Sequence, residues 1–308
     1  MGLDPFRQIL QRRVNDLVRW LPAAGRCEPL AVHRVRVASR RLREVLPVVA
    51  SGKRGRLLRT SARRVTRALG PVRELNVTLA MLTEFASRIR LSRDSVARVS
   101  GPIEEERQRR CARVPRRLER SDVRRFGARA LEAMGERPAR EMAHARLLDV
   151  DVRAGRRAMQ LSAAIENAAG LYLPERLHAV RIGVKKLRYA LELGQSLGAV
   201  RRTARAAPAV RATAEVARLR TLRQAQKRLG RMHDLEVLIA RIRTLQGTAA
   251  AAGLDVSADL DQLVRRLEHE CRDLHGKYMA ARGDLLAVCD RVEAVAEKRQ
   301  RGGGVDGR

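Results

Sequence analysis

Residues 33–43 read HRVRVASRRLR, and residues 178–188 read HAVRIGVKKLR. The two segments agree at the histidine, at four basic positions and at a leucine, 145 residues apart, and a proline precedes each histidine by four residues. A second pair of segments follows them, LGPVRELNV at residues 69–77 and LGRMHDLEV at residues 229–237, 160 residues apart. Such recurrence predicts a tandem duplication with 15 extra residues in the second half.

Each copy of the first segment predicts an amphipathic helix with a basic face. At 100° per residue, the histidine and three basic positions fall within an arc of roughly 80°, opposite an apolar stripe. The prolines, Pro29 and Pro174, fit the first turn of a helix, where a missing N–H costs nothing. The residues on this face are His33, Arg36, Arg40 and Arg43 in the first copy and His178, Arg181, Lys185 and Arg188 in the second.

Composition indicates a polyanionic partner. The chain has 308 residues, with 65 Lys and Arg against 34 Asp and Glu, for a formal charge of +31. So large a surplus destabilises a compact state by self-repulsion unless an anion shares the surface. With one Trp, three Tyr and three Phe, the chain lacks the stacking platform that single-stranded nucleic acid usually requires.

Cysteine spacing and hydropathy argue against a zinc-binding, a secreted and a membrane-spanning protein. The four cysteines show no C-x-x-C spacing, which argues against a zinc site and for free thiols. The N-terminus has no secretory apolar run, and no stretch reaches the roughly 18 apolar residues of a membrane span. We therefore expect a soluble, cytoplasmic protein that does not contact membranes.

Periodicity predicts an all-α chain, because apolar residues recur every three or four positions and helix-forming residues dominate. We expect a first helical half at residues 1–140, a second at 141–298 and a disordered tail at 299–308. Gly70 and Gly230 are expected to end helices, and breaks are expected at Gly101-Pro102, at 135–138 and at 198–208. The expected helices are 3–20, 30–50, 54–69, 73–91, 94–118, 121–135, 144–170, 175–196, 209–229, 233–246, 256–278 and 281–298.

The pattern H-x-x-R-x-x-x-(R/K)-(R/K)-L-R, followed by L-G-x-x-(R/H)-(D/E) and present twice, resembles the CHAD family, the conserved histidine α-helical domain. The resemblance spans nearly the whole chain, and Glu74 stands where the family more often has Asp. It implies two pseudo-symmetric antiparallel helical bundles around a basic groove or channel that binds inorganic polyphosphate without catalysis. It also suggests a place on polyphosphate granules.

The candidate binding residues are the basic positions of both copies. Arg41 and Lys186 lie toward the edge of the basic arc and could face solvent instead. The helix before each Leu-Gly pair adds basic residues four apart on one face, and one basic residue follows each glycine by three positions. The full set is His33, Arg36, Arg40, Arg41, Arg43, Arg63, Arg67, Arg73, His178, Arg181, Lys185, Lys186, Arg188, Arg223, Lys227 and His233.

The leading hypothesis is therefore a non-catalytic polyphosphate-binding protein with no metal and no cofactor. The sequence contains no G-x-x-x-x-G-K-(S/T) loop, and its nearest acidic run, residues 104–106, lies in a helical context and suits a solvated patch. The alternative is a nucleic-acid-binding or nucleoid-associated protein, which the charge also permits. A third class, an enzyme acting on polyphosphate, would show metal-dependent phosphate release.

Overall fold

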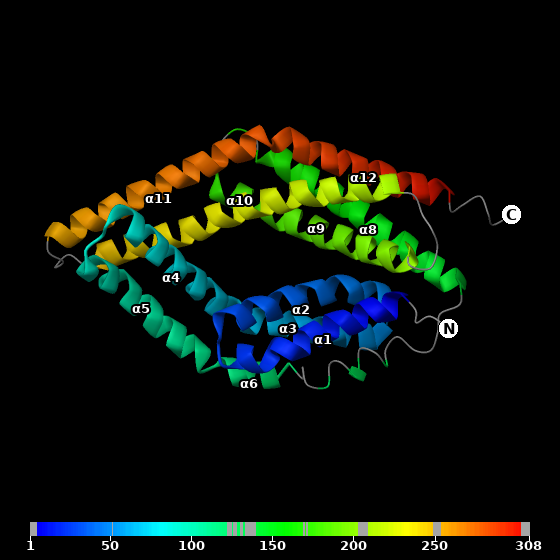
Figure 1. Cartoon of the computed structure of the whole chain (residues 1–308), viewed down its shortest axis with the longest axis horizontal. Helices are drawn as coiled ribbons and strands as arrows, with labels where there is room; N and C mark the ends of the chain where they lie inside the picture. Colours follow the sequence, from blue (N-terminus) through cyan, green and yellow to red (C-terminus); the bar gives the residue numbers. More distant parts are fainter. Residues whose placement is uncertain are drawn as a thin grey trace.

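The computed structural model describes residues 5–50, 52–121, 140–168, 172–202, 209–248 and 254–302, together with residues 125, 128, 129, 132 and 170. The all-α prediction is confirmed, because every element that these residues form is a helix (Figure 1). No helix within this described part combines the length and apolarity that crossing a membrane requires. The helices are α1 (Pro5–Gly25), α2 (Pro29–Val49), α3 (Gly52–Ala68), α4 (Gly70–Ile89), α5 (Arg93–Cys111), α6 (Val114–Glu119), α8 (Arg140–Asn167), α9 (Pro174–Arg202), α10 (Ala209–Thr248), α11 (Leu254–Ala280) and α12 (Arg282–Gly302).

The two Leu-Gly segments fold differently. Helices α3 and α4 are separated only by Leu69, whose backbone stays in the right-handed helical region. Pro71 in the first turn of α4 lacks an N–H and cannot continue the hydrogen-bond ladder of α3, which explains the break. The matched position of the second half is Arg231, and α10 runs unbroken for 40 residues. The predicted helix end at Gly230 is therefore wrong.

Three other predicted boundaries also need correction. Helix α5 passes through Pro102 without ending, so the break expected there is wrong. Helix α9 extends to Arg202, beyond the start of the loop expected from residue 198. Helix α12 continues to Gly302, so residues 299–302 are helical rather than the start of a tail. The expected loop at 135–138, the rest of the tail and most of the helix expected at 121–135 lie outside the described residues.

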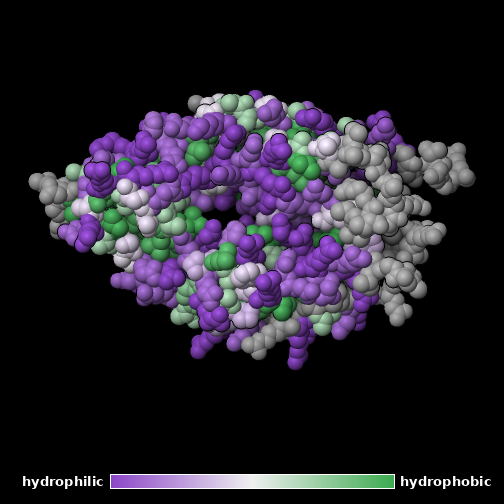
Figure 2. Space-filling model, in the orientation of Figure 1, coloured by the Kyte–Doolittle hydropathy of each residue, from purple (hydrophilic) through white to green (hydrophobic). Residues whose placement is uncertain are grey.

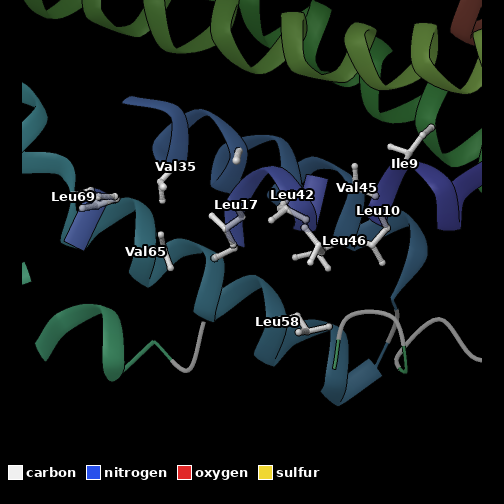
Figure 3. Packing of buried hydrophobic residues seen from close by; sticks show 14 of the residues in the cluster. Ile9, Leu10, Leu17, Val35, Leu42, Val45, Leu46, Leu58, Val65 and Leu69 are labelled. Carbon is white, nitrogen blue, oxygen red and sulfur yellow. The ribbon is translucent and has the colours of Figure 1, made fainter. Parts of the chain in front are cut away.

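One hydrophobic core joins α1, α2, α3 and α6, and residues of α4, α8 and α9 pack at its edge. Its side chains come from positions three or four apart on each helix, such as Leu10, Val14 and Leu17 of α1, so each helix turns one apolar stripe inward. Figure 3 shows these stripes meeting, with Leu42 and Leu46 of α2 directed toward residues of α1 and α3. Truncating such a fully buried leucine to alanine typically costs about 2–5 kcal/mol.

Two further cores complete the molecule. One is formed by α8, α9, α10 and α12. The other brings α4 and α5 against α10 and α11, at the left of Figure 1. Because α4 and α5 belong to the first half of the sequence and α10 and α11 to the second, the two halves share this core.

Candidate functional site

A cavity of about 1120 Å³ lies among α2, α4, α9, α10 and α11. Figure 2 shows an opening near the middle of the molecule with a largely hydrophilic rim. Nine arginine and lysine side chains and four carboxylates line the cavity, so positive charge is in clear excess. The lining residues are His33, Arg36, Val37, Arg40, Gly70, Arg73, Glu74, Val77, Glu84, Arg88, Arg181, Lys185, Gln224, Gln226, Lys227, Arg228, Gly230, Arg231, His233, Asp234, Glu270 and Leu274.

Helix α2 supplies the first basic wall of the cavity. Its apolar stripe is buried in the core with α1 and α3, which turns His33, Arg36 and Arg40 toward the cavity. The Nη1 atom of Arg36 donates a hydrogen bond to the carbonyl oxygen of Thr66, at 2.6 Å. A Cβ atom on Gly70 would lie 3.1 Å from the same Nη1, so glycine leaves room for the guanidinium there.

Helix α9 supplies the second wall, with Arg181 and Lys185. Burial, followed by the charges of Arg181 and Arg40, lowers the pKa of Lys185 to about 7. Burial, followed by the charges of Arg40 and Arg73, likewise lowers the pKa of Arg36 to about 10. Cations of both walls thus oppose charge on Lys185, and the nearby carboxylates Asp234 and Glu74 offset only part of the lowering of these pKa values.

Burial and the nearby cations also lower the pKa values of the histidines of the two motifs. The rings of His178 and His233 lie with centroids 4.9 Å apart. Burial, then Arg181 and His178, lowers the pKa of His233 to about 4. The pKa values of His178 and His33 are also lowered, first by burial and then by nearby guanidinium groups. An empty cavity therefore keeps its histidines neutral near pH 7.

The carboxylates nearest the motifs compensate little of this charge. Asp234 Oδ1 lies 4.0 Å from Arg181 Nη2, too far for a hydrogen bond. Burial raises the pKa of Asp234, although Arg181 and Arg73 oppose the shift. Glu74 lies 3.8 Å from Arg241 Nη2, and its side chain is half exposed. The basic centre of the cavity remains open to an external anion.

Arg231 closes the α4–α11 end of the cavity with a paired network. Its guanidinium donates to Glu84 of α4 at 2.7 Å and to Glu270 of α11 at 2.8 Å, and it lies over the ring of Phe85. Comparison of the two sequence copies missed Arg231, because its matched residue is Pro71. The acidic partners also come from positions without a counterpart in the motifs.

Half of the predicted binding residues line the cavity, and a further one lies next to it. His178 is not part of the lining but contacts His233, which is. The predicted residues that line the cavity are His33, Arg36, Arg40, Arg73, Arg181, Lys185, Lys227 and His233.

Three predicted residues surround Glu192 instead of lining the cavity. Glu192 is a buried carboxylate of α9, and Arg188 Nη1 donates to it at 2.5 Å. Arg41 Nε donates to its other oxygen at 3.3 Å, and Arg223 Nη2 lies 3.8 Å away. Glu192 thereby joins α2, α9 and α10 through charge, and its partners are engaged within the protein.

The remaining four predicted residues lie outside the cavity lining. Arg43 of α2 feels the charges of Arg63 and Arg67 of α3, which lower its pKa after burial, the larger effect. Lys186 is exposed, and its carbonyl oxygen accepts a hydrogen bond from Arg157. Arg63 and Arg67 are also exposed, and Arg67 borders a separate pocket.

The donors in and around the cavity do not form a metal site. Across the described ranges, no three His, Cys, Asp or Glu side chains are grouped so that they could hold an ion. The four cysteines are free thiols, and none lines the cavity. The arrangement offers guanidinium, ammonium and imidazole donors, which are suited to phosphate oxygens.

Comparison with known proteins agrees with this architecture. The family model described as CHAD domain matches residues 8–216. The fold resembles the crystal structure of the CHAD domain from the plant Ricinus communis, with a TM-score of 0.62 at 20% identity over 91% of this chain and 94% of that one. It also resembles PptA from Streptomyces chartreusis, with a TM-score of 0.63 at 16% identity over 90% of this chain and 98% of that one. No curated protein matches the sequence.

Proposed function

This chain belongs to the CHAD domain family, and we propose that it binds inorganic polyphosphate in the central cavity without catalysing its hydrolysis or transfer. The observation that carries this proposal is the opposition of Arg36 and Arg40 of α2 to Arg181 and Lys185 of α9 around one cavity. Burial, together with the charges of neighbouring cations, lowers the pKa values of Arg36 and Lys185, so these charges destabilise the protein when no anion is bound. A chain of phosphates supplies the missing negative charge along the whole cavity.

The chemistry of the lining favours a phosphate chain without bases or sugars. Its polar groups are mainly guanidinium, ammonium, imidazole and amide donors, with four carboxylates in the minority, and no Phe, Tyr or Trp of the described residues is among the lining. Base recognition normally uses aromatic stacking or contacts to base edges in a groove. A DNA duplex is also too wide to enter between two neighbouring helices, so it would contact only the rim.

The proposed absence of catalysis rests on how the carboxylates are engaged. Phosphoryl-transfer enzymes use carboxylates to hold divalent metal ions against the phosphates. Glu84 and Glu270 are instead held by Arg231, Glu74 lies near Arg241, and Asp234, without a hydrogen bond to Arg181, lies beside the charges of Arg181 and Arg73. We therefore expect the purified protein to release no phosphate from polyphosphate in the presence of magnesium, and sustained release would contradict this part of the proposal.

Two adjacent lysines give a matched test of the binding site. Lys185 lines the cavity, whereas Lys186 is exposed outside it. Lys185→Gln should weaken binding of long-chain polyphosphate about tenfold or more, on the scale of a lost charge-assisted contact, while Lys186→Gln should change it little. Binding is measured by isothermal titration calorimetry at near-physiological salt, with duplex DNA as a competitor and concentrations counted per phosphate. Equal effects of the two substitutions, or DNA that competes as well as polyphosphate, would favour general charge attraction and the nucleic-acid alternative.

A protein that holds polyphosphate in this way would accumulate at polyphosphate granules. A fluorescent fusion of the native protein should co-localise with granules in a polyphosphate-accumulating host, and the Lys185→Gln variant should do so less. A distribution that is unchanged in cells without polyphosphate would contradict this location.

A further inference from the structure

A second pocket, separate from the central cavity, lies between α3 and α6. It has a volume of about 540 Å³ and is lined by Arg64, Arg67, Ala68, Arg117 and Arg120. Four of its five lining residues are arginines, so guanidinium groups dominate its surface. Of the four, only Arg67 was among the binding residues predicted from the sequence; Arg64, Arg117 and Arg120 were not.

These arginines have no acidic partner within the described residues. Helix α3 carries six arginines and one lysine and no Asp or Glu. The only acidic residue of α6, Glu119, is not part of the pocket lining. Other surface arginines of the protein do pair, as Arg109 does with Glu105. Four guanidinium groups that no described acid pairs with have the donors for several phosphate oxygens, because each guanidinium presents its N–H groups in a planar fork.

The pocket is connected to the central cavity through one turn of α3. Arg36, in the cavity, donates to the carbonyl oxygen of Thr66, and the next residue, Arg67, lines the pocket. Arg43 lies one turn of α2 beyond Arg40 of the cavity and is close enough to Arg63 and Arg67 for their charges to lower its pKa, after burial. A line of cations therefore leads from the cavity, past Arg43, to the pocket.

In the second half of the chain, the positions that match the arginines of α3 belong to a different part of the basic surface. The positions that match Arg64 and Arg67, displaced by 160 residues, are Gln224 and Lys227, and both line the central cavity itself. On α3 the same face instead meets α6, which packs against α3. The pocket thus extends the basic surface of the central cavity along α3 and α6, which belong to the first half of the sequence.

We propose that the pocket of Arg64, Arg67, Arg117 and Arg120 is a second phosphate-binding site, which holds the part of a long polyphosphate chain that leaves the central cavity along α3. This inference rests on the proposed function, because it takes the same ligand. Occupation of both sites by one chain makes the second contact intramolecular, so the pocket should strengthen binding of long chains selectively. Short chains, which fill only the more enclosed cavity, should not depend on it.

The test compares two pairs of arginines from the same short segment. Arg117→Gln with Arg120→Gln removes two charges from the pocket, and Arg113→Gln with Arg116→Gln removes two exposed charges outside it. Titration calorimetry with tripolyphosphate and with long-chain polyphosphate measures both affinities, and thermal unfolding checks the fold. We expect the pocket variant to bind long chains about tenfold more weakly and tripolyphosphate unchanged, with the control pair near wild type for both.

The outcomes separate this inference from the proposed function. Equal losses for the two arginine pairs, no loss for either, or an equal loss for tripolyphosphate would overturn the second site while leaving the cavity as the binding site. A loss of duplex DNA binding with polyphosphate binding unchanged would assign the pocket to nucleic acid and overturn the inference as well. If wild-type protein binds neither polyphosphate, the proposed function fails and the second site falls with it.

Discussion

His178 of α9 and His233 of α10 lie with their imidazole ring centroids 4.9 Å apart and their planes tilted by 55°. The two rings come from the two different motifs of the second half of the sequence, and Arg181 and Lys185 add positive charge beside them. Two imidazolium groups at this distance repel each other unless an anion lies between or beside them. The pair therefore links the protonation of the site to the binding of phosphate.

Affinity for polyphosphate should rise as the pH falls from about 7.5 to 5.5, around the ordinary pKa of histidine. In the free protein the pKa values of His178 and His233 are lowered, so both are neutral near pH 7. Bound phosphate raises these pKa values, and binding takes up protons. Calorimetry in two buffers of different ionisation enthalpy measures this uptake. His178→Gln with His233→Gln should reduce this pH dependence to the part that Lys185, with a pKa of about 7, contributes, and an undiminished dependence in this variant would rule out the pair as a source.

Lys185 should make the unliganded protein less stable near neutral pH. Its pKa is about 7 in the folded state, well below the ordinary lysine value of 10.5, so the unfolded chain binds more protons between these limits. The free energy of unfolding of the wild type should therefore rise with pH between about 7 and 10 relative to Lys185→Met. At pH 7 the variant should be more stable by about 1–3 kcal/mol, while it binds polyphosphate more weakly.

Denaturant unfolding at several pH values gives this difference directly. Lys186→Met serves as the control, because its exposed side chain adds no comparable repulsion. A Lys185→Met protein that is less stable than the wild type at pH 7 would mean that packing of the lysine stem outweighs the repulsion.

The two glycines of the Leu-Gly segments should respond oppositely to alanine. Gly230 lies within α10, and an added Cβ there meets no atom within 4 Å, so Gly230→Ala should stabilise the protein by about 0.5–1 kcal/mol. A Cβ on Gly70 would lie 3.1 Å from Arg36 Nη1, which is held against the Thr66 carbonyl. Gly70→Ala should not stabilise the protein, because the added Cβ displaces the Arg36 guanidinium, and it should weaken polyphosphate binding several-fold. Equal stabilisation of both variants, measured by urea unfolding, would show that Arg36 moves aside freely.

Glu192 should be important for folding rather than for ligand binding. Its side chain is 9% exposed and that of its partner Arg188 is 11% exposed, so Glu192→Gln leaves a buried guanidinium without its carboxylate. We expect a loss of about 3–5 kcal/mol in the free energy of unfolding. Glu297→Gln removes a surface pair with Arg301, also four residues apart, and should cost less than about 0.5 kcal/mol. Similar costs for both substitutions would contradict the structural role of Glu192.

Helical periodicity was sufficient to predict the basic walls of the cavity. His33, Arg36 and Arg40 lie on one face of α2 because an apolar stripe occupies the other, and this relation is local. The placement of Arg188 could not be predicted in this way. Arg188 lies on the predicted face, but its guanidinium donates to Glu192, one turn further along α9. The residue of the first half that matches Glu192 is Pro47, so comparison of the two copies does not reveal this ion pair.

The repeated sequence motifs also could not predict contacts between helices that are far apart in sequence. The ion pairs of Arg231 with Glu84 and Glu270 join α10 to α4 and α11, and neither acid belongs to a repeated motif. The break between α3 and α4 was predicted from sequence, although on the basis of Gly70, and in the structure Pro71 is the residue that ends the hydrogen-bond ladder. Helix α10 has no such break, because Arg231 stands where the first half has Pro71. The prediction relied on the matched glycines, Gly70 and Gly230, and so did not take this difference into account.

The core shared by α4, α5, α10 and α11 affects how the chain folds while it is synthesised on the ribosome. Leu82, Phe85 and Ile103 are buried against residues such as Leu238 and Leu263, which lie about 150 positions later in the sequence. At ribosomal rates of about 5–20 residues per second, the apolar stripe of α4 and α5 stays uncovered for on the order of ten seconds after its own synthesis. Closing so long a loop slows folding and exposes the nascent chain to aggregation. A chaperone should therefore bind the nascent chain at α4 and α5, and release it only once α11 has left the ribosome.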